Sequence, residues 1–181
     1  RFSQLLQAKK QDILINVFKK LVNKGLGKWR LILAGGTDIG GEEYFNQLQI
    51  QAESYPIEFL KNPDFKVLQN LYGKAKIFWS ASGFGVNEKE EPEKVEHFGI
   101  TIVEAMAAGC IPMAVDKGGP KEIIEDGKTG FLWQSEEELI QQTIQLVKDP
   151  AIVKRLAQKV IKSSQRFDKI IFYRKFDEII S

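Results

Sequence analysis

The sequence has few of the residues that form disulfides or hold metal ions. Its 181 residues include one cysteine, Cys110, and one histidine, His97. A lone cysteine excludes an internal disulfide, and its place beside Gly109 and Ile111 predicts a buried packing residue rather than a reactive thiol. One histidine argues against a histidine-based metal site. The sequence also has no Asp-x-Asp pair that could hold a metal-bound diphosphate, so we expect no metal and no cofactor.

Long apolar runs and a strong excess of one charge are also missing. The net charge of +2 at pH 7 is too small to indicate a nucleic-acid partner. The longest apolar stretches, such as residues 31–36, have the length of a strand and fall well short of a membrane span. With 43% hydrophobic and 28% charged residues, we expect one soluble globular domain over residues 1–181.

Helical and strand patterns alternate along the chain. Apolar residues at helical spacing predict helices over 12–22, 42–54, 65–72, 100–108 and 121–125, and from residue 135 onward with breaks near 149–150 and 163–164. Short apolar runs predict strands over 29–34, 57–60, 76–80, 111–115 and 130–133. Alternating strands and helices with short connections predict an α/β fold, with a parallel sheet covered by helices on both faces. Ligands of such sheets bind beyond the carboxyl ends of the strands.

Two carboxylates, Glu96 and Glu104, flank the most informative stretch of the chain. Seven residues separate them, and an unbroken helix would place them about 12 Å apart along its axis. They can serve one ligand only if Glu96 lies on the approach loop, Gly99 makes a bend and Glu104 lies within the helix. The amides of residues 100–102 would then be unpaired donors at a helix N-terminus, where anions bind. Carboxylates suit sugar hydroxyls and free amides suit phosphate, which favours a nucleotide-sugar as the ligand.

Three other segments have weaker patterns. Residues 35–41 are rich in glycine, but they fit neither a phosphate-binding P-loop nor a dinucleotide fingerprint, and we expect a strand-to-helix turn there. The glutamates between 88 and 96 alternate with lysines, which predicts a solvated loop rather than a metal site. Gly118-Gly119 predicts either a turn into a helix begun by Pro120 or backbone that approaches the ligand.

Residues 95–133 closely resemble the retaining glycosyltransferases of family 4, also called group 1 glycosyltransferases. The pattern of that family is E-x-F-G-x-x-x-x-E-A-M-A-x-G-x-P-V, followed by G-G-x-x-E-I-[IV]-x-x-G-x-x-G. This sequence matches it from Glu96 to Gly109 and from Gly118 to Gly130, and Pro112 stands one residue later than the proline of the pattern. Looser similarity includes Arg1-Phe2 with Lys9-Lys10, and residues 29–35 and 72–80.

The resemblance implies a GT-B enzyme, in which two Rossmann-like domains enclose an active site. It covers the C-terminal, donor-binding domain alone. The N-terminal acceptor domain would then be absent from this chain, which would begin in the first strand of the donor domain and be inactive by itself. The implied reaction is metal-independent sugar transfer from a nucleoside-diphosphate sugar, with retention of anomeric configuration. The form E-H-F-G-I resembles a subset of mannosyltransferases, which favours GDP-mannose over a UDP-sugar.

The resemblance also assigns roles to individual residues. Glu96 would contact the donor sugar, and Glu104 the ribose hydroxyls. Arg1 and one lysine would contact the diphosphate, and the spacing to the helix that follows favours Lys9 over Lys10. The other expected donor contacts form the turn and helix start after Glu96: His97, Phe98, Gly99, Ile100 and Thr101.

The expected partners are a nucleotide-sugar donor and a glycan or lipid-linked acceptor, the latter bound through the missing N-terminal domain. We expect a cytoplasmic location, with peripheral association of the full-length enzyme at the cytoplasmic membrane face. Two other functions stay open at this point. One is a GT-B-like nucleotide-sugar epimerase or sugar-phosphate synthase, and the other is a non-catalytic module that uses the same fold for interaction.

Overall fold

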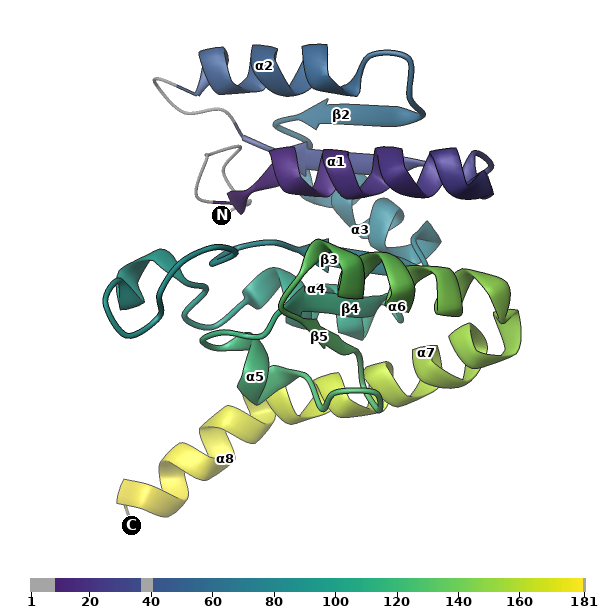
Figure 1. Ribbon diagram of the computed structural model, residues 1–181. Coiled ribbons are helices and arrows are strands. Elements are labelled where there is room, and N and C mark those ends of the chain that lie inside the picture. The colour runs from purple at the N-terminus through teal and green to yellow at the C-terminus, as the bar shows by residue number, and fades with distance from the viewer. Residues whose placement is uncertain (1–8, 37–40, 181) are drawn as a thin grey trace.

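The computed structural model describes residues 9–36 and 41–180. Its strands pair in parallel throughout, as expected for alternating βα units (Figure 1). One sheet contains β1 (Leu31–Gly35) and β2 (Ile57–Lys61). The other has the order β3 (Ile77–Ser80), β4 (Ile111–Val115) and β5 (Phe131–Trp133).

The helices follow the strands in the expected alternation. They are α1 (Gln11–Leu21), α2 (Glu42–Ala52), α3 (Phe65–Lys74), α4 (Ile100–Ala107), α5 (Pro120–Ile123), α6 (Glu136–Lys148), α7 (Pro150–Ser164) and α8 (Lys169–Ile180). Four begin at a side-chain cap, because Asp64, Ser135, Asp149 and Asp168 each accept a hydrogen bond from a first-turn amide. None of the described helices is both long enough and apolar enough to cross a membrane.

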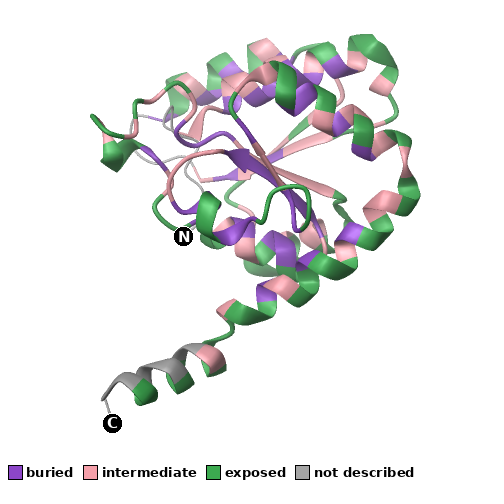
Figure 2. Cartoon of the chain, turned by 60° about the horizontal axis from the view of Figure 1, so that its bottom comes forward, coloured by how far each residue is buried: buried purple, intermediate pink, exposed green. Residues whose placement is uncertain are grey.

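Strand β4 lies at the centre of the larger sheet, and all five of its residues are buried (Figure 2). Ile111, Met113 and Val115 join a core with α1 and α6, whereas Ala114 joins a second core with α4, α5 and α7. Alternate residues of a strand point to opposite faces. The larger sheet is therefore covered by helices on both faces, as the sequence predicts.

Helix α1 packs on both sheets. Its residue Ile15 belongs to the core of the smaller sheet, with Leu33 and residues of α2. Its residues Leu14, Val17 and Leu21 belong to the core of the larger sheet. Lys9 lies two residues before this helix. Its position therefore depends on a helix that packs against both sheets.

The strands form two sheets rather than the single sheet expected from the sequence. In the described parts of the chain, β1 is not hydrogen-bonded to β3. A cavity of about 1060 Å³ is lined by both strands and by residues of α3. Apolar periodicity specifies which face of a strand is buried but not which neighbour it pairs with, so the sequence pattern could not reveal this division.

Candidate functional site

The loop before α4 has the bend that the sequence predicts. Gly99 adopts a left-handed conformation with φ 96° and lies at the N-terminus of α4. This left-handed conformation favours glycine, and a Cβ atom at this position would lie 2.9 Å from Cδ1 of Ile102, so that side chain would have to shift. The bend separates the loop that carries Glu96 from the helix that carries Glu104.

The helix start offers fewer free amides than expected. The amide of Ile102 donates to the carbonyl of Gly99 at 2.9 Å, so the prediction that it is unpaired is wrong. A tight first turn uses this donor before any ligand can. The amides of Ile100 and Thr101 have no partner among the described residues and remain available for an anion.

Lys9 and Glu96 form an ion pair across 87 residues of sequence. Nζ of Lys9 lies 2.7 Å from Oε2 of Glu96, with the two side chains 32% and 21% exposed. A pair in such a partly solvated setting adds little to stability, typically about 0–1 kcal/mol. Its main effect is to place a cation beside a carboxylate where the segment before α1 meets the loop before α4.

Glu104 has a neighbour that the sequence reasoning did not include in the site. The hydroxyl of Tyr72 donates to Oε2 of Glu104 over a long distance of 3.5 Å. Burial, and then the negative charge of Glu104, raise the pKa of Tyr72 well above its ordinary value, so its hydroxyl keeps its proton and acts as a donor. The only signal in the sequence was the position of Tyr72 at the start of a segment that resembles the family.

Four of the predicted residues meet at one cavity. Lys9, Glu96, Thr101 and Glu104 all line the space that continues between β1 and β3. Glu96 and Glu104 therefore line a common cavity, although seven residues separate them in sequence. This is the arrangement that the nucleotide-sugar hypothesis requires.

The other predicted residues do not line this cavity in the described part of the chain. Phe98 packs edge-to-face on Phe167, with ring centroids 5.8 Å apart. His97 and Ile100 are exposed, Gly99 makes the bend, and Lys10 lies in a left-handed turn before α1. Arg1, and residues 37–40 of the glycine-rich loop, lie outside the described residues. The roles assigned to all these residues stay predictions.

The pair Gly118-Gly119 packs against the Glu96 loop. The amide of Gly119 donates to the carbonyl of Glu96 at 2.8 Å. A Cβ atom on Gly118 would lie 2.4 Å from that carbonyl oxygen, and one on Gly119 would lie 2.3 Å from the carbonyl oxygen of His97. Of the two readings left open by the sequence, the structure supports a turn into α5, with Pro120 as its first residue. The backbone of the two glycines comes close to the loop that carries Glu96.

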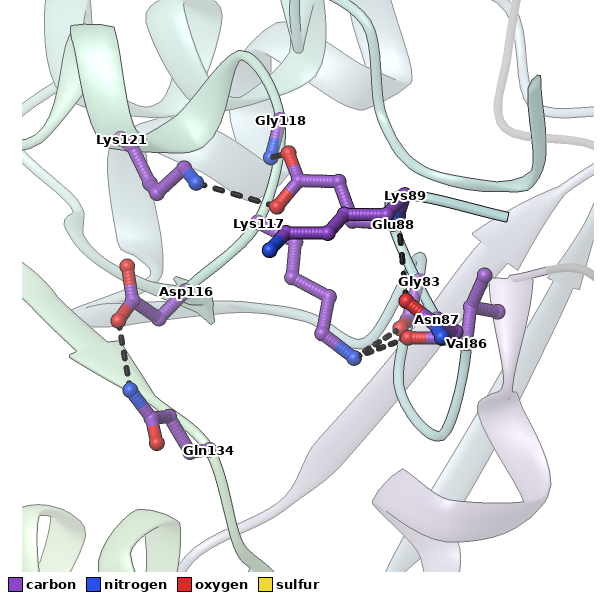
Figure 3. A network of polar contacts seen from close by, with 10 residues as sticks. All are labelled: Gly83, Val86, Asn87, Glu88, Lys89, Asp116, Lys117, Gly118, Lys121 and Gln134. Atoms are coloured by element: carbon purple, nitrogen blue, oxygen red, sulfur yellow. Dashed lines mark hydrogen bonds and ion pairs between the residues drawn. The ribbon is translucent and has the colours of Figure 1, made fainter. Parts of the chain in front are cut away.

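The acidic loop is only partly the solvated segment that its composition predicts. Glu88 accepts the amide of Gly118 at 2.7 Å and pairs with Lys121 at 3.1 Å (Figure 3). These contacts hold the pKa of Glu88 below its ordinary value, with the Gly118 hydrogen bond as the largest cause. Among the described residues, no three side chains of the types that ligate metals gather at one place. That the reaction needs no metal stays a prediction.

Cys110 is the buried packing residue that the sequence predicts, and burial raises the pKa of its thiol to about 11. Only about one thiol in a thousand would then be ionised at pH 8, against about one in ten at a pKa near 9. We expect iodoacetamide to label native Cys110 at least about 100-fold more slowly than the chain unfolded in guanidinium. Mass spectrometry of timed samples measures both rates, and equal rates would show that the thiol is accessible.

Comparison with known protein families shows to which family the chain belongs. The family described as "Glycosyl transferases group 1" matches residues 2–166. The chain belongs to the group 1 glycosyltransferases. It is 34% identical over 170 residues to the human "GDP-Man:Man(3)GlcNAc(2)-PP-Dol alpha-1,2-mannosyltransferase", a match that includes 84% of this chain and 31% of that protein. The chain thus spans about a third of the length of the curated relatives it matches.

Solved structures of related proteins have the same fold as this group 1 glycosyltransferase chain. Anabaena Alr3699/HepE in complex with UDP and glucose superimposes with a TM-score of 0.78 at 25% identity, over 99% of this chain and 46% of that one. The C-terminal domain of a group 1 family protein (LpcC) from Francisella tularensis has a TM-score of 0.70 over 90% of this chain and 80% of that one. The Rossmann-like fold of a GT-B C-terminal domain is therefore confirmed.

Proposed function

We propose that this chain binds the donor of a retaining glycosyltransferase, and that the donor is GDP-mannose in preference to a UDP-sugar. The main support for the proposal is that Lys9, Glu96, Thr101 and Glu104 line one cavity at the N-terminus of α4. A cation and free amides suit a diphosphate, and two carboxylates suit the hydroxyls of two sugars. The name of the human relative, which includes GDP-Man, supports the choice of base and sugar.

In the proposed reaction these residues stabilise the leaving group. When the bond to the sugar breaks, negative charge builds on the departing phosphate oxygen. Lys9 supplies a point charge, and the amides of Ile100 and Thr101 supply donors reinforced by the dipole of α4. Arg1 would add a second cation. Charge-assisted hydrogen bonds of this kind contribute about 1.5–3 kcal/mol each.

The carboxylates have separate tasks in this proposal. Glu104 binds the ribose hydroxyls, with its side chain steadied by Tyr72. Glu96 binds hydroxyls of the donor sugar and stabilises the positive charge that develops at the anomeric carbon. The glycan or lipid-linked acceptor would be bound by an N-terminal domain of the longer enzyme, which would work at the cytoplasmic membrane face.

Isothermal titration calorimetry of this chain with GDP, UDP, GDP-mannose and UDP-glucose tests the proposal. We expect GDP and GDP-mannose to bind more tightly than the uridine ligands. Glu104→Ala should weaken GDP binding by about tenfold, because one charge-assisted contact to the ribose is lost.

The control is Glu53→Ala, at the exposed end of α2 and away from the cavity, which should leave the affinity unchanged. A folded chain without measurable affinity for any of the four ligands would contradict the proposed function. An unchanged affinity in Glu104→Ala would remove that residue from the ribose.

A further inference from the structure

The Glu96 loop is held from a distance by a set of contacts that no motif predicts. Three consecutive residues after β4 bind the loop that runs from residue 81 to residue 96. Nζ of Lys117 donates to the carbonyls of Gly83 and Val86 at 3.3 and 2.5 Å (Figure 3). The next residue, Gly118, donates its amide to Glu88, and Gly119 donates its amide to the carbonyl of Glu96.

The contacts run in the same order along both segments, from the start of the loop to its end. Lys117 holds the beginning of the loop, Gly118 its middle, and Gly119 the backbone of Glu96 itself. Val95, directly before Glu96, is buried, and a Cβ atom on either Gly83 or Gly118 would approach it within 3.1 Å. The loop and the turn therefore leave little free space between them, and a shift in one must move the other.

Glu88 contacts the turn through both of its carboxylate oxygens. One carboxylate oxygen accepts the Gly118 amide at 2.7 Å, and the other pairs with Lys121 at 3.1 Å. Figure 3 shows the carboxylate between these two donors, above the Lys117 side chain. The other loop glutamates make no such contact with the 116–121 turn in the described residues.

We propose that Glu88 is a positioning residue for Glu96, acting through the amides of Gly118 and Gly119. It fixes the turn that holds the Glu96 carbonyl, and so fixes where the Glu96 carboxylate stands relative to Lys9 and to the donor sugar. The proposal rests on the proposed function in one respect, the role of Glu96 on the sugar. The mechanical link from Glu88 to Glu96 rests on the contacts alone.

The test compares two ligands that differ by the sugar. Glu88→Ala should weaken the binding of GDP-mannose to this chain by about fivefold, because misplacing a contact group by a fraction of an ångström weakens its hydrogen bonds. The affinity for GDP should stay within about twofold, because GDP lacks the group that Glu96 contacts. A purely structural role would weaken both ligands equally, or neither, and either result would overturn the proposal.

Three further variants sharpen the comparison. Glu88→Gln keeps an oxygen that can accept the Gly118 amide and should restore most of the lost affinity. Lys121→Ala removes the ion pair but keeps that hydrogen bond, and should have little effect. Glu90→Ala, an exposed glutamate of the same loop, is the matched control. Loss of affinity in Glu88→Gln as large as in Glu88→Ala would show that the charge, not the hydrogen bond, acts on the turn.

A measurement without ligand separates this proposal from the proposed function. The ¹³C shift of the Glu96 side-chain carboxyl, assigned by NMR, should differ between the wild type and Glu88→Ala and should be unchanged in Glu90→Ala. If the wild type binds none of the nucleotides, the proposed function fails while the carboxyl shift still decides the link to Glu88. An identical Glu96 carboxyl shift in Glu88→Ala and in the wild type would refute the link.

Discussion

Replacing Gly119 by alanine should lower the free energy of unfolding of the chain by about 3 kcal/mol or more. The added Cβ atom would lie 2.3 Å from the carbonyl oxygen of His97, and 2.7 Å from the carbonyl carbon of His97 and from Cα of Phe98. All three atoms belong to the backbone, so no side chain can rotate away to relieve the contact. The turn or the Glu96 loop must move, and the hydrogen bond between Gly119 and Glu96 would be lost.

Urea unfolding followed by circular dichroism measures this change. The matched control is Gly73→Ala in helix α3, where no heavy atom lies within 4 Å of the added Cβ. Because alanine favours a helix over glycine, this control should stabilise the chain by about 0.5–1 kcal/mol. Equal midpoints for the Gly119→Ala variant and the wild type would mean that the turn can withdraw from the Glu96 loop without cost.

Breaking the Lys9–Glu96 ion pair from either side should change nucleotide affinity in opposite directions. In the free chain the ammonium group of Lys9 is already paired with Glu96 at 2.7 Å, so a diphosphate must compete with that carboxylate. Lys9→Met should weaken GDP binding by about 10- to 100-fold, because one charge-assisted contact to the diphosphate is removed. Glu96→Gln should strengthen GDP binding slightly, because the competing charge is gone.

With GDP-mannose the Glu96→Gln variant should bind more weakly than the wild type, since a carboxylate contact to the sugar is lost. Calorimetry with both ligands on both variants gives the full comparison. Lys10→Met is the matched control, because Lys10 is the adjacent lysine and does not line the cavity. If Lys10→Met weakens GDP binding more than Lys9→Met, the prediction that Lys9 rather than Lys10 contacts the diphosphate is wrong.

The local structure could be predicted from the sequence, with small errors at the ends of elements. The helix expected over 42–54 ends at Ala52, and the short helix expected over 121–125 covers Pro120–Ile123. The helix break expected near 163–164 falls just after Ser164, where a short 3₁₀ turn follows. Apolar spacing defines the interior of an element well, but its ends depend on caps and contacts that the spacing does not contain.

The candidate site was predictable where it lies within one continuous motif. Glu96, Gly99, Thr101 and Glu104 are close in sequence, and one bend and one helix bring them together. The contribution of Lys9 required the resemblance, since 87 residues separate it from Glu96. Contacts such as those of Glu88 with Gly118, or of Tyr72 with Glu104, join distant segments without any repeated pattern, so only coordinates reveal them.

The anchoring of α1 on both sheets has a consequence for how a donor would be held. A diphosphate bound to Lys9 would be held by a residue that α1 positions, and α1 packs into two separate hydrophobic cores, one through Ile15 and the other through Leu14. A substitution that loosens either core should therefore weaken donor binding by displacing Lys9.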